Sequence, residues 1–238
     1  TGLAFSGYIA GEPVTFGVSG FLYNNNLVLY DHQTQSYWPQ MLFTAAWGER
    51  GGTQVELHPI FEMTWDAWKA LYPNTTVVDR QYSTSYYPYG EYVTDNNHIL
   101  FSQYVDPRLE SKDMVIGVIG TATARAYPFK DLGERAVIND VLDGEPIVVF
   151  YDAMAEGAAV FKRPVLEDGT VVEFSQPSAT DAFPFTVGAA NTEGSWRFDG
   201  TGVSGTAVGA DLVQMATSYK GFWLSWGAYY RDIDIYGR

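Results

Sequence analysis

The first residue of the chain, Thr1, has the most direct route to covalent chemistry. A free amino-terminal threonine can serve as nucleophile and base together, because its amine accepts the proton of its own hydroxyl. No Lys, Arg or oxyanion-hole motif lies nearby in the sequence to support that role. Proteolysis of a longer chain leaves the same terminus, so we favour a fragment boundary and keep Thr1 as a candidate catalytic residue.

Four polar residues form a second group of candidates, at the ends of expected strands or in turns: Asp31, Arg125, Asp140 and Asp152. An arginine among several carboxylates can bind a polar ligand, but such groups more often form structural ion pairs or Asx-turns. We therefore predict a structural role for these residues and keep a polar site as the alternative.

The sequence gives little support for metal or thiol chemistry. It contains no cysteine, and His32, His58 and His98 lie far apart, without the i, i+4 pairing of a helical zinc site. Residues 17–20, Gly-Val-Ser-Gly, lack the spacing of a nucleophile elbow. We predict neither a metal nor a cofactor.

A tyrosine-rich segment is the candidate recognition surface. Its members gather around a Pro and a Gly: Tyr82, Tyr86, Tyr87, Tyr89 and Tyr92. Rigid amphipathic rings supply contact area at low entropic cost in binding surfaces. The segment can equally pack on the body of the protein, and we favour packing.

Composition excludes several classes of protein. The 238 residues are 46% hydrophobic, which is enough for a globular core. A net charge of -14 repels the phosphates of nucleic acids and of anionic membranes. No run reaches the roughly 18 apolar residues of a membrane-spanning helix. High aromatic and Gly content with little Lys suits a β-rich protein that is extracytoplasmic, either periplasmic or secreted.

The spacing of tryptophan predicts an internal repeat. Six of the seven fall into two groups with the same internal intervals: Trp38, Trp65 and Trp68, and Trp196, Trp223 and Trp226. The groups are offset by 158 positions, from Trp38 to Trp196. The same offset relates further pairs: Gly11 and Gly169, Val14 and Val172, Phe16 and Phe174, and Tyr72 and Tyr230. We therefore predict two pseudo-equivalent modules.

Patterning predicts a mainly β fold of the α+β type, in which each module ends in a short Trp-rich helix. Strands are expected over residues 13–18, 27–30, 136–142 and 147–151, with a turn at Asp168-Gly169. The first helix is expected from Thr64, as N-cap, to Tyr72, with Trp65, Trp68 and Tyr72 on one buried face. Residues 222–230 are its counterpart.

The repeat divides the chain into three parts. Residues 1–80 form the first repeat, residues 81–112 a Tyr-rich connection, and residues 113–238 the second, complete repeat. The second repeat has a lead-in at residues 115–151, whose counterpart in the first would precede Thr1. We therefore expect the first module to be truncated at its amino terminus and completed by another polypeptide.

Several segments in order along the chain carry a family resemblance: residues 16–22, 26–34, 65–73, 124–128, 137–140 and 222–226. They resemble a widespread bacterial and archaeal family of uncharacterised extracytoplasmic proteins, classed as a domain of unknown function. The resemblance covers nearly the whole chain. It implies an internally duplicated, β-rich and usually exported protein, and it brings no known activity.

The resemblance also bears on the amino-terminal part. In similar sequences the lead-in of the first copy ends in a Cys-Pro-x-Cys element, immediately before the counterpart of Thr1. This chain lacks that element and has no cysteine in the cognate segment, residues 148–152. Thiol or metal chemistry tied to it therefore does not extend to the residues present here.

Two hypotheses for function follow. In the first, the chain is a noncatalytic extracytoplasmic binding or structural subunit, completed by a partner chain or by its own amino-terminal fragment. In the second, it is the larger fragment of a processed enzyme, either a hydrolase with Thr1 as nucleophile or an enzyme with thiol chemistry on the missing segment. We favour the first, because the sequence contains no evident catalytic constellation.

Overall fold

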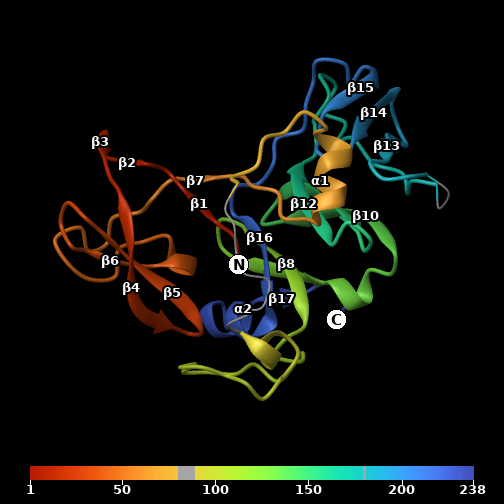
Figure 1. Ribbon diagram of the computed structural model, residues 1–238. Helices are drawn as coiled ribbons and strands as arrows, with labels where there is room; N and C mark the ends of the chain where they lie inside the picture. Colours follow the sequence, from red (N-terminus) through yellow and green to blue (C-terminus); the bar gives the residue numbers. More distant parts are fainter. Residues whose placement is uncertain (80–88, 179–180) are drawn as a thin grey trace.

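The computed structural model describes residues 1–79, 89–178 and 181–238. The protein is mainly β, with 37% of residues in strands and 11% in helices, so the predicted fold class is confirmed at that level. The strands form several small sheets rather than one large one. Figure 1 shows one lobe of amino-terminal strands, a second lobe of central and late strands, and the amino terminus between them.

The amino-terminal lobe is built on a three-stranded antiparallel sheet in the order β4-β5-β6. The elements here are β1 (Ala4–Phe5), β2 (Tyr8–Ile9), β3 (Glu12–Pro13), β4 (Phe16–Tyr23), β5 (Asn26–Asp31), β6 (Tyr37–Pro39), a 3-10 helix (Gln40–Leu42) and β7 (Leu57–His58). Asn24 and Asn25 have φ of 46° and 58°, which suits the two-residue turn between β4 and β5. Phe16 packs edge-on against the buried Trp38 ring, with centroids 5.6 Å apart. The strand predicted over 13–18 is interrupted, because β3 ends at Pro13.

A four-stranded sheet occupies the middle of the molecule, in the order β16-β8-β9-β17. Its strands are β8 (Met114–Ile119), β9 (Ala124–Pro128), β16 (Ser218–Phe222) and β17 (Asp234–Ile235). Helix α2 (Trp223–Tyr229) follows β16 directly and buries Trp223 and Trp226 completely. Gly117 makes this possible, because a Cβ there would lie 2.3 Å from the Trp226 ring.

The second lobe contains two three-stranded antiparallel sheets, β10-β11-β12 and β13-β14-β15. The strands are β10 (Arg135–Leu142), β11 (Glu145–Asp152), β12 (Gly157–Lys162), β13 (Thr186–Gly188), β14 (Gly194–Arg197) and β15 (Gly202–Gly205). Phe150, Phe161 and Trp196 lie in one core cluster that joins these sheets. The strands predicted over 136–142 and 147–151 are confirmed as β10 and β11.

Helix α1 (Trp65–Leu71) follows the first lobe in sequence but packs on the second, where Leu71 enters the core beside Phe150 and Trp196. The predicted N-cap is confirmed, since the Thr64 side chain accepts a hydrogen bond from Ala67 N. The predicted buried tryptophan face is wrong for this helix. Ala67 and Leu71 are its buried residues and Trp65 is 48% exposed, because no strand pair in the described part of the chain covers its outer side.

Two strand pairs in different lobes share one register. In the first, β5 and β6 align Val28 with Pro39, Leu29 with Trp38 and Tyr30 with Tyr37. In the second, β13 and β14 align Thr186 with Arg197, Val187 with Trp196 and Gly188 with Ser195. Every residue of the second set stands 158 positions after its counterpart in the first. The bridges Phe16 to Asp31 and Phe174 to Ala189 have the same relation.

Candidate functional site

Asp31 is a fully buried carboxylate at the end of β5 that closes the turn into β6. Trp38 Nε1 donates to it at 3.0 Å, and Thr34 N at 2.6 Å. Burial opposes ionisation, but these hydrogen bonds outweigh it and lower the pKa of Asp31. With its oxygens engaged inside the fold, Asp31 has the geometry of a structural turn residue.

The structure brings two of the predicted polar residues together, Arg125 on β9 and Asp140 on β10. Arg125 Nη1 lies 2.7 Å from each carboxylate oxygen of Asp140, and Tyr127 Oη donates to the same carboxylate at 2.7 Å. Arg125 also reaches Asp234 on β17 at 3.3 Å. Burial raises the pKa of Asp140, but its bonds to Arg125 and Tyr127 lower it overall. The cluster therefore joins three strands as a satisfied ion-pair network.

Asp152 lies at the other end of the β10-β11 pair and belongs to a different cluster. Arg135 Nη2 contacts its carboxylate at 2.9 Å, and Ala155 N donates to it at 2.9 Å. The Arg135 guanidinium also stacks 4.2 Å from the centroid of the Phe185 ring. These two side chains line an open hollow together with Glu134, Gln176, Asp181 and Phe183. Arg135 and Asp152 already engage each other, so neither charge is left unpaired in this hollow.

Thr1 is exposed and lies against β16, where its Oγ1 is 3.0 Å from the position of a Cβ built on Gly221. Within the described ranges, no hydrogen bond or ion pair reaches Thr1. Its role as a nucleophile stays a prediction, as does the processed-enzyme hypothesis that depends on it.

The tyrosine-rich segment is only partly visible, because Tyr82, Tyr86 and Tyr87 lie outside the described residues. Tyr89 is mostly exposed, whereas the Tyr92 ring sits beside Phe222 and 3.4 Å below Lys112 Nζ. Burial raises the pKa of Tyr92. Tyr92 therefore packs on the central sheet, and the recognition role of the segment stays a prediction.

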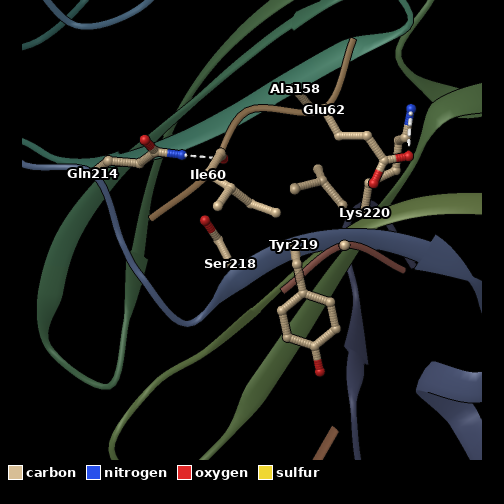
Figure 2. Close-up of a pocket in the computed structure, with 9 residues that line it drawn as sticks. Ile60, Glu62, Ala158, Gln214, Ser218, Tyr219 and Lys220 are labelled. Carbon is tan, nitrogen blue, oxygen red and sulfur yellow. Dashed lines mark hydrogen bonds and ion pairs between the residues drawn. The ribbon is translucent and has the colours of Figure 1, made fainter. Parts of the chain in front are cut away.

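A small hollow lies where segment 60–62 meets β16, next to Gly2 (Figure 2). Lys220 Nζ contacts Glu62 at 3.1 Å across it, and Gln214 Nε2 donates to Ile60 O at 2.8 Å. The facing residues are counterparts in the 158-position offset, since Ile60 corresponds to Ser218 and Glu62 to Lys220. A volume of about 10 Å³ holds one water, so the hollow is a packing contact between the two segments and is too small for a substrate.

One feature that the sequence analysis missed is an apolar surface around α1, which we call the α1 face. It consists of Phe61, Met63, Trp65, Trp68, Val77 and Val78, which line one open hollow. Trp68 also borders a second hollow at the end of the helix. Val77 is 68% exposed and Val78 is 87% exposed, unusual values for adjacent valines beside two tryptophans.

Two classes of site are absent from the described residues. No three His, Asp or Glu side chains gather there as ligands for a metal ion. No helix in the described ranges combines the length and the apolar character needed to cross a bilayer.

Comparison with known proteins returns a family but no characterised relative. No curated protein and no solved structure matches the chain. A family model described as "protein of unknown function (DUF3179)" matches residues 1–233, nearly the full length. The chain therefore belongs to the DUF3179 family.

Proposed function

We propose that this chain is a noncatalytic extracytoplasmic binding or structural subunit made of two similar modules. A partner chain, or the protein's own amino-terminal fragment, completes the first module. The α1 face carries this proposal, because it is a contiguous apolar surface with no cover among the described residues.

The shared strand registers support the two-module part of the proposal. The β5-β6 and β13-β14 pairs align residue for residue at one constant offset. The helices α1 and α2 have the same bounds at that offset, and their C-cap residues Tyr72 and Tyr230 have similar dihedral angles (φ -129°, ψ 73° and φ -122°, ψ 81°). Unrelated segments would not keep both strand register and helix ends over such a length.

Reciprocal contacts between the two regions give further support. Tyr72 Oη donates to Asp199 Oδ2 at 3.0 Å, and Tyr230 Oη donates to Met41 O at 2.8 Å. Met41 and Asp199 are themselves 158 positions apart. The tyrosine at the end of each helix thus donates a hydrogen bond to the equivalent residue of the other region, as expected for two modules related by a pseudo-twofold axis.

The polar groups fit a binding or structural role better than catalysis. Asp31, Arg125, Asp140 and Asp152 are all engaged in hydrogen bonds or ion pairs within the fold. The pKa of Asp31 and of Asp140 is lowered, away from the range expected of a general acid or base at neutral pH. The acidic charge of the chain directs the proposal toward a polypeptide partner rather than nucleic acid.

The proposal is tested on native material purified without denaturant, by native mass spectrometry and amino-terminal sequencing. We expect a second polypeptide in equimolar amount. A photo-crosslinking residue at Val78 should attach to that polypeptide, whereas one at Val208, which is similarly exposed on the β15 side, should not. A monomeric chain of 26.4 kDa with no crosslink at Val78 would refute the proposal.

A further inference from the structure

The carboxyl-terminal region shows what covers the counterpart of the α1 face. Trp223, Trp226 and Ile235 lie in one buried cluster with Val115 of β8 and with Ala124 and Ala126 of β9. β8 pairs antiparallel with β16, and β9 pairs parallel with β17. The β8-β9 hairpin is therefore the cover of the second Trp-rich helix.

The first region has the same apolar surface, but no strand among the described residues covers it in the way that β8 and β9 cover α2. Trp65 and Val77 correspond to Trp223 and Ile235, yet they are 48% and 68% exposed where their counterparts are 0% and 7% exposed. Segment 60–63 corresponds to β16 and runs into α1 in the same way. Within the described chain, no hydrogen bond engages the backbone amides of Phe61, Glu62 and Met63.

We propose that the α1 face binds a β-hairpin of another polypeptide segment, with the side-chain pattern of residues 114–128. The first strand of that hairpin pairs antiparallel with residues 60–63, and the second lies parallel to Thr76–Val77. This inference rests on the proposed function and names its partner by chemistry: an apolar, glycine-containing hairpin that adds to a sheet edge.

The register of β16 with β8 specifies the partner further. Tyr219 stands opposite Gly117, where any side chain would run into the Trp226 ring. The matching position in the partner lies opposite Phe61 and beneath Trp68, so it must also be glycine. Small residues like Ala124 and Ala126 are needed on the second strand, because in the carboxyl-terminal region they pack in the same cluster as Trp223 and Trp226.

Binding of a synthetic hairpin to the full chain tests the inference directly. The probe is a fluorescently labelled peptide of residues 112–130, followed by anisotropy. We expect saturable binding that weakens about tenfold or more in Trp65→Asp and in Val77→Asp, since exposed anchors of this kind dominate such interfaces. Val208→Asp is the matched control, because it adds the same charge at an exposed valine elsewhere. A Gly117→Leu peptide should not bind.

A fusion provides a second measurement that does not depend on the peptide folding alone. A second copy of residues 113–158 is placed directly before Thr1, and amide hydrogen exchange is followed at residues 60–63. We expect the amides that point toward the added strand, which are alternate ones in an antiparallel pair, to exchange at least about tenfold more slowly, because each of these gains a ladder hydrogen bond. The same fusion with Gly117→Leu in the added copy should leave them unprotected.

The outcomes separate this inference from the proposed function. The hairpin proposal is overturned if amide exchange at residues 60–63 is unchanged in the fusion, or if the peptide binds Trp65→Asp and the parent chain with equal affinity. The chain could instead self-associate in a way that Trp65→Asp abolishes and the peptide does not affect. That result would assign the α1 face to a second copy of the chain and would also overturn the hairpin proposal. If the hairpin fails while a native partner still crosslinks at Val78, the subunit proposal stands without this occupant.

Discussion

Two helices of seven residues, α1 and α2, have the same boundaries at an offset of 158 positions but opposite surroundings. Both begin with Trp and have a second Trp three residues later. In α2 both rings are fully buried beneath the β8-β9 hairpin, whereas in α1 the first ring is half exposed. The comparison shows that local sequence is enough to form the helix, whereas the burial of its side chains depends on which strands pack against it.

The sharpest way to break this comparison is to remove the first tryptophan of each helix. Trp223→Ala should lower the free energy of unfolding by about 3 to 5 kcal/mol, because it opens a large cavity in the central core. Trp65→Ala should cost less than about 1 kcal/mol, because its ring is half in solvent. Urea unfolding followed by circular dichroism measures both. Equal losses would contradict the difference in burial.

The next largest effect concerns the contact between Gly117 and Trp226. Gly117→Ala should lower the free energy of unfolding by about 1 to 3 kcal/mol, because the new methyl group would overlap the indole ring. Gly188→Ala is the control, since no atom lies within 4 Å of the Cβ it would add. A harmless Gly117→Ala would mean that α2 does not press on β8 as described.

The reciprocal tyrosines sharpen the comparison through pH. Burial, and in Tyr72 also the charge of Asp199, raises the pKa of Tyr72 and of Tyr230 to about 12 from an ordinary 10.0. The unfolded state releases these protons first, so their contribution is complete below pH 10.0 and is lost as pH rises to about 12. Tyr72→Phe and Tyr230→Phe should each lower the free energy of unfolding by about 1 kcal/mol at neutral pH. Each should also reduce the fall of that free energy between pH 10.0 and about 12.

Stability measured from pH 8 to 12 in the two single variants and the double variant tests that prediction. A slope that neither substitution changes would show that the two hydroxyls are not held as the contacts with Asp199 and Met41 require.

The smallest expected difference lies at the helix starts. Thr64→Ala should cost about 0.5 to 1 kcal/mol, because Ala67 N loses its hydrogen bond to the Thr64 side chain. Phe222, at the same place before α2, makes no such cap bond, so α2 relies on the buried core around it. Thermal unfolding compares Thr64→Ala with Thr64→Ser. Recovery in the serine variant identifies the cap as the cause.

Much of the local structure could be predicted from the residues. The pattern of apolar residues between turns predicted β5, β10 and β11. The position of α1 was predicted from Thr64 as N-cap and the apolar helical pattern that follows it. Arg125, Tyr127 and Asp140 could not be joined in advance, because their contact depends on how β9 crosses β10. The separation of Asp31 and Asp152 from that cluster has the same origin. Such pairings depend on the tertiary path of the chain and leave no local signal.

The sequence by itself determined the mainly β class, the turns, the helix ends and the repeated spacing of the tryptophans. Only the tertiary structure decided that one Trp-rich helix is buried and the other carries an exposed apolar face. The physical reason is that helix formation depends on neighbouring residues and caps, whereas burial depends on strands distant in sequence. β8 and β9 cover α2, and no described strand covers α1 in the same way.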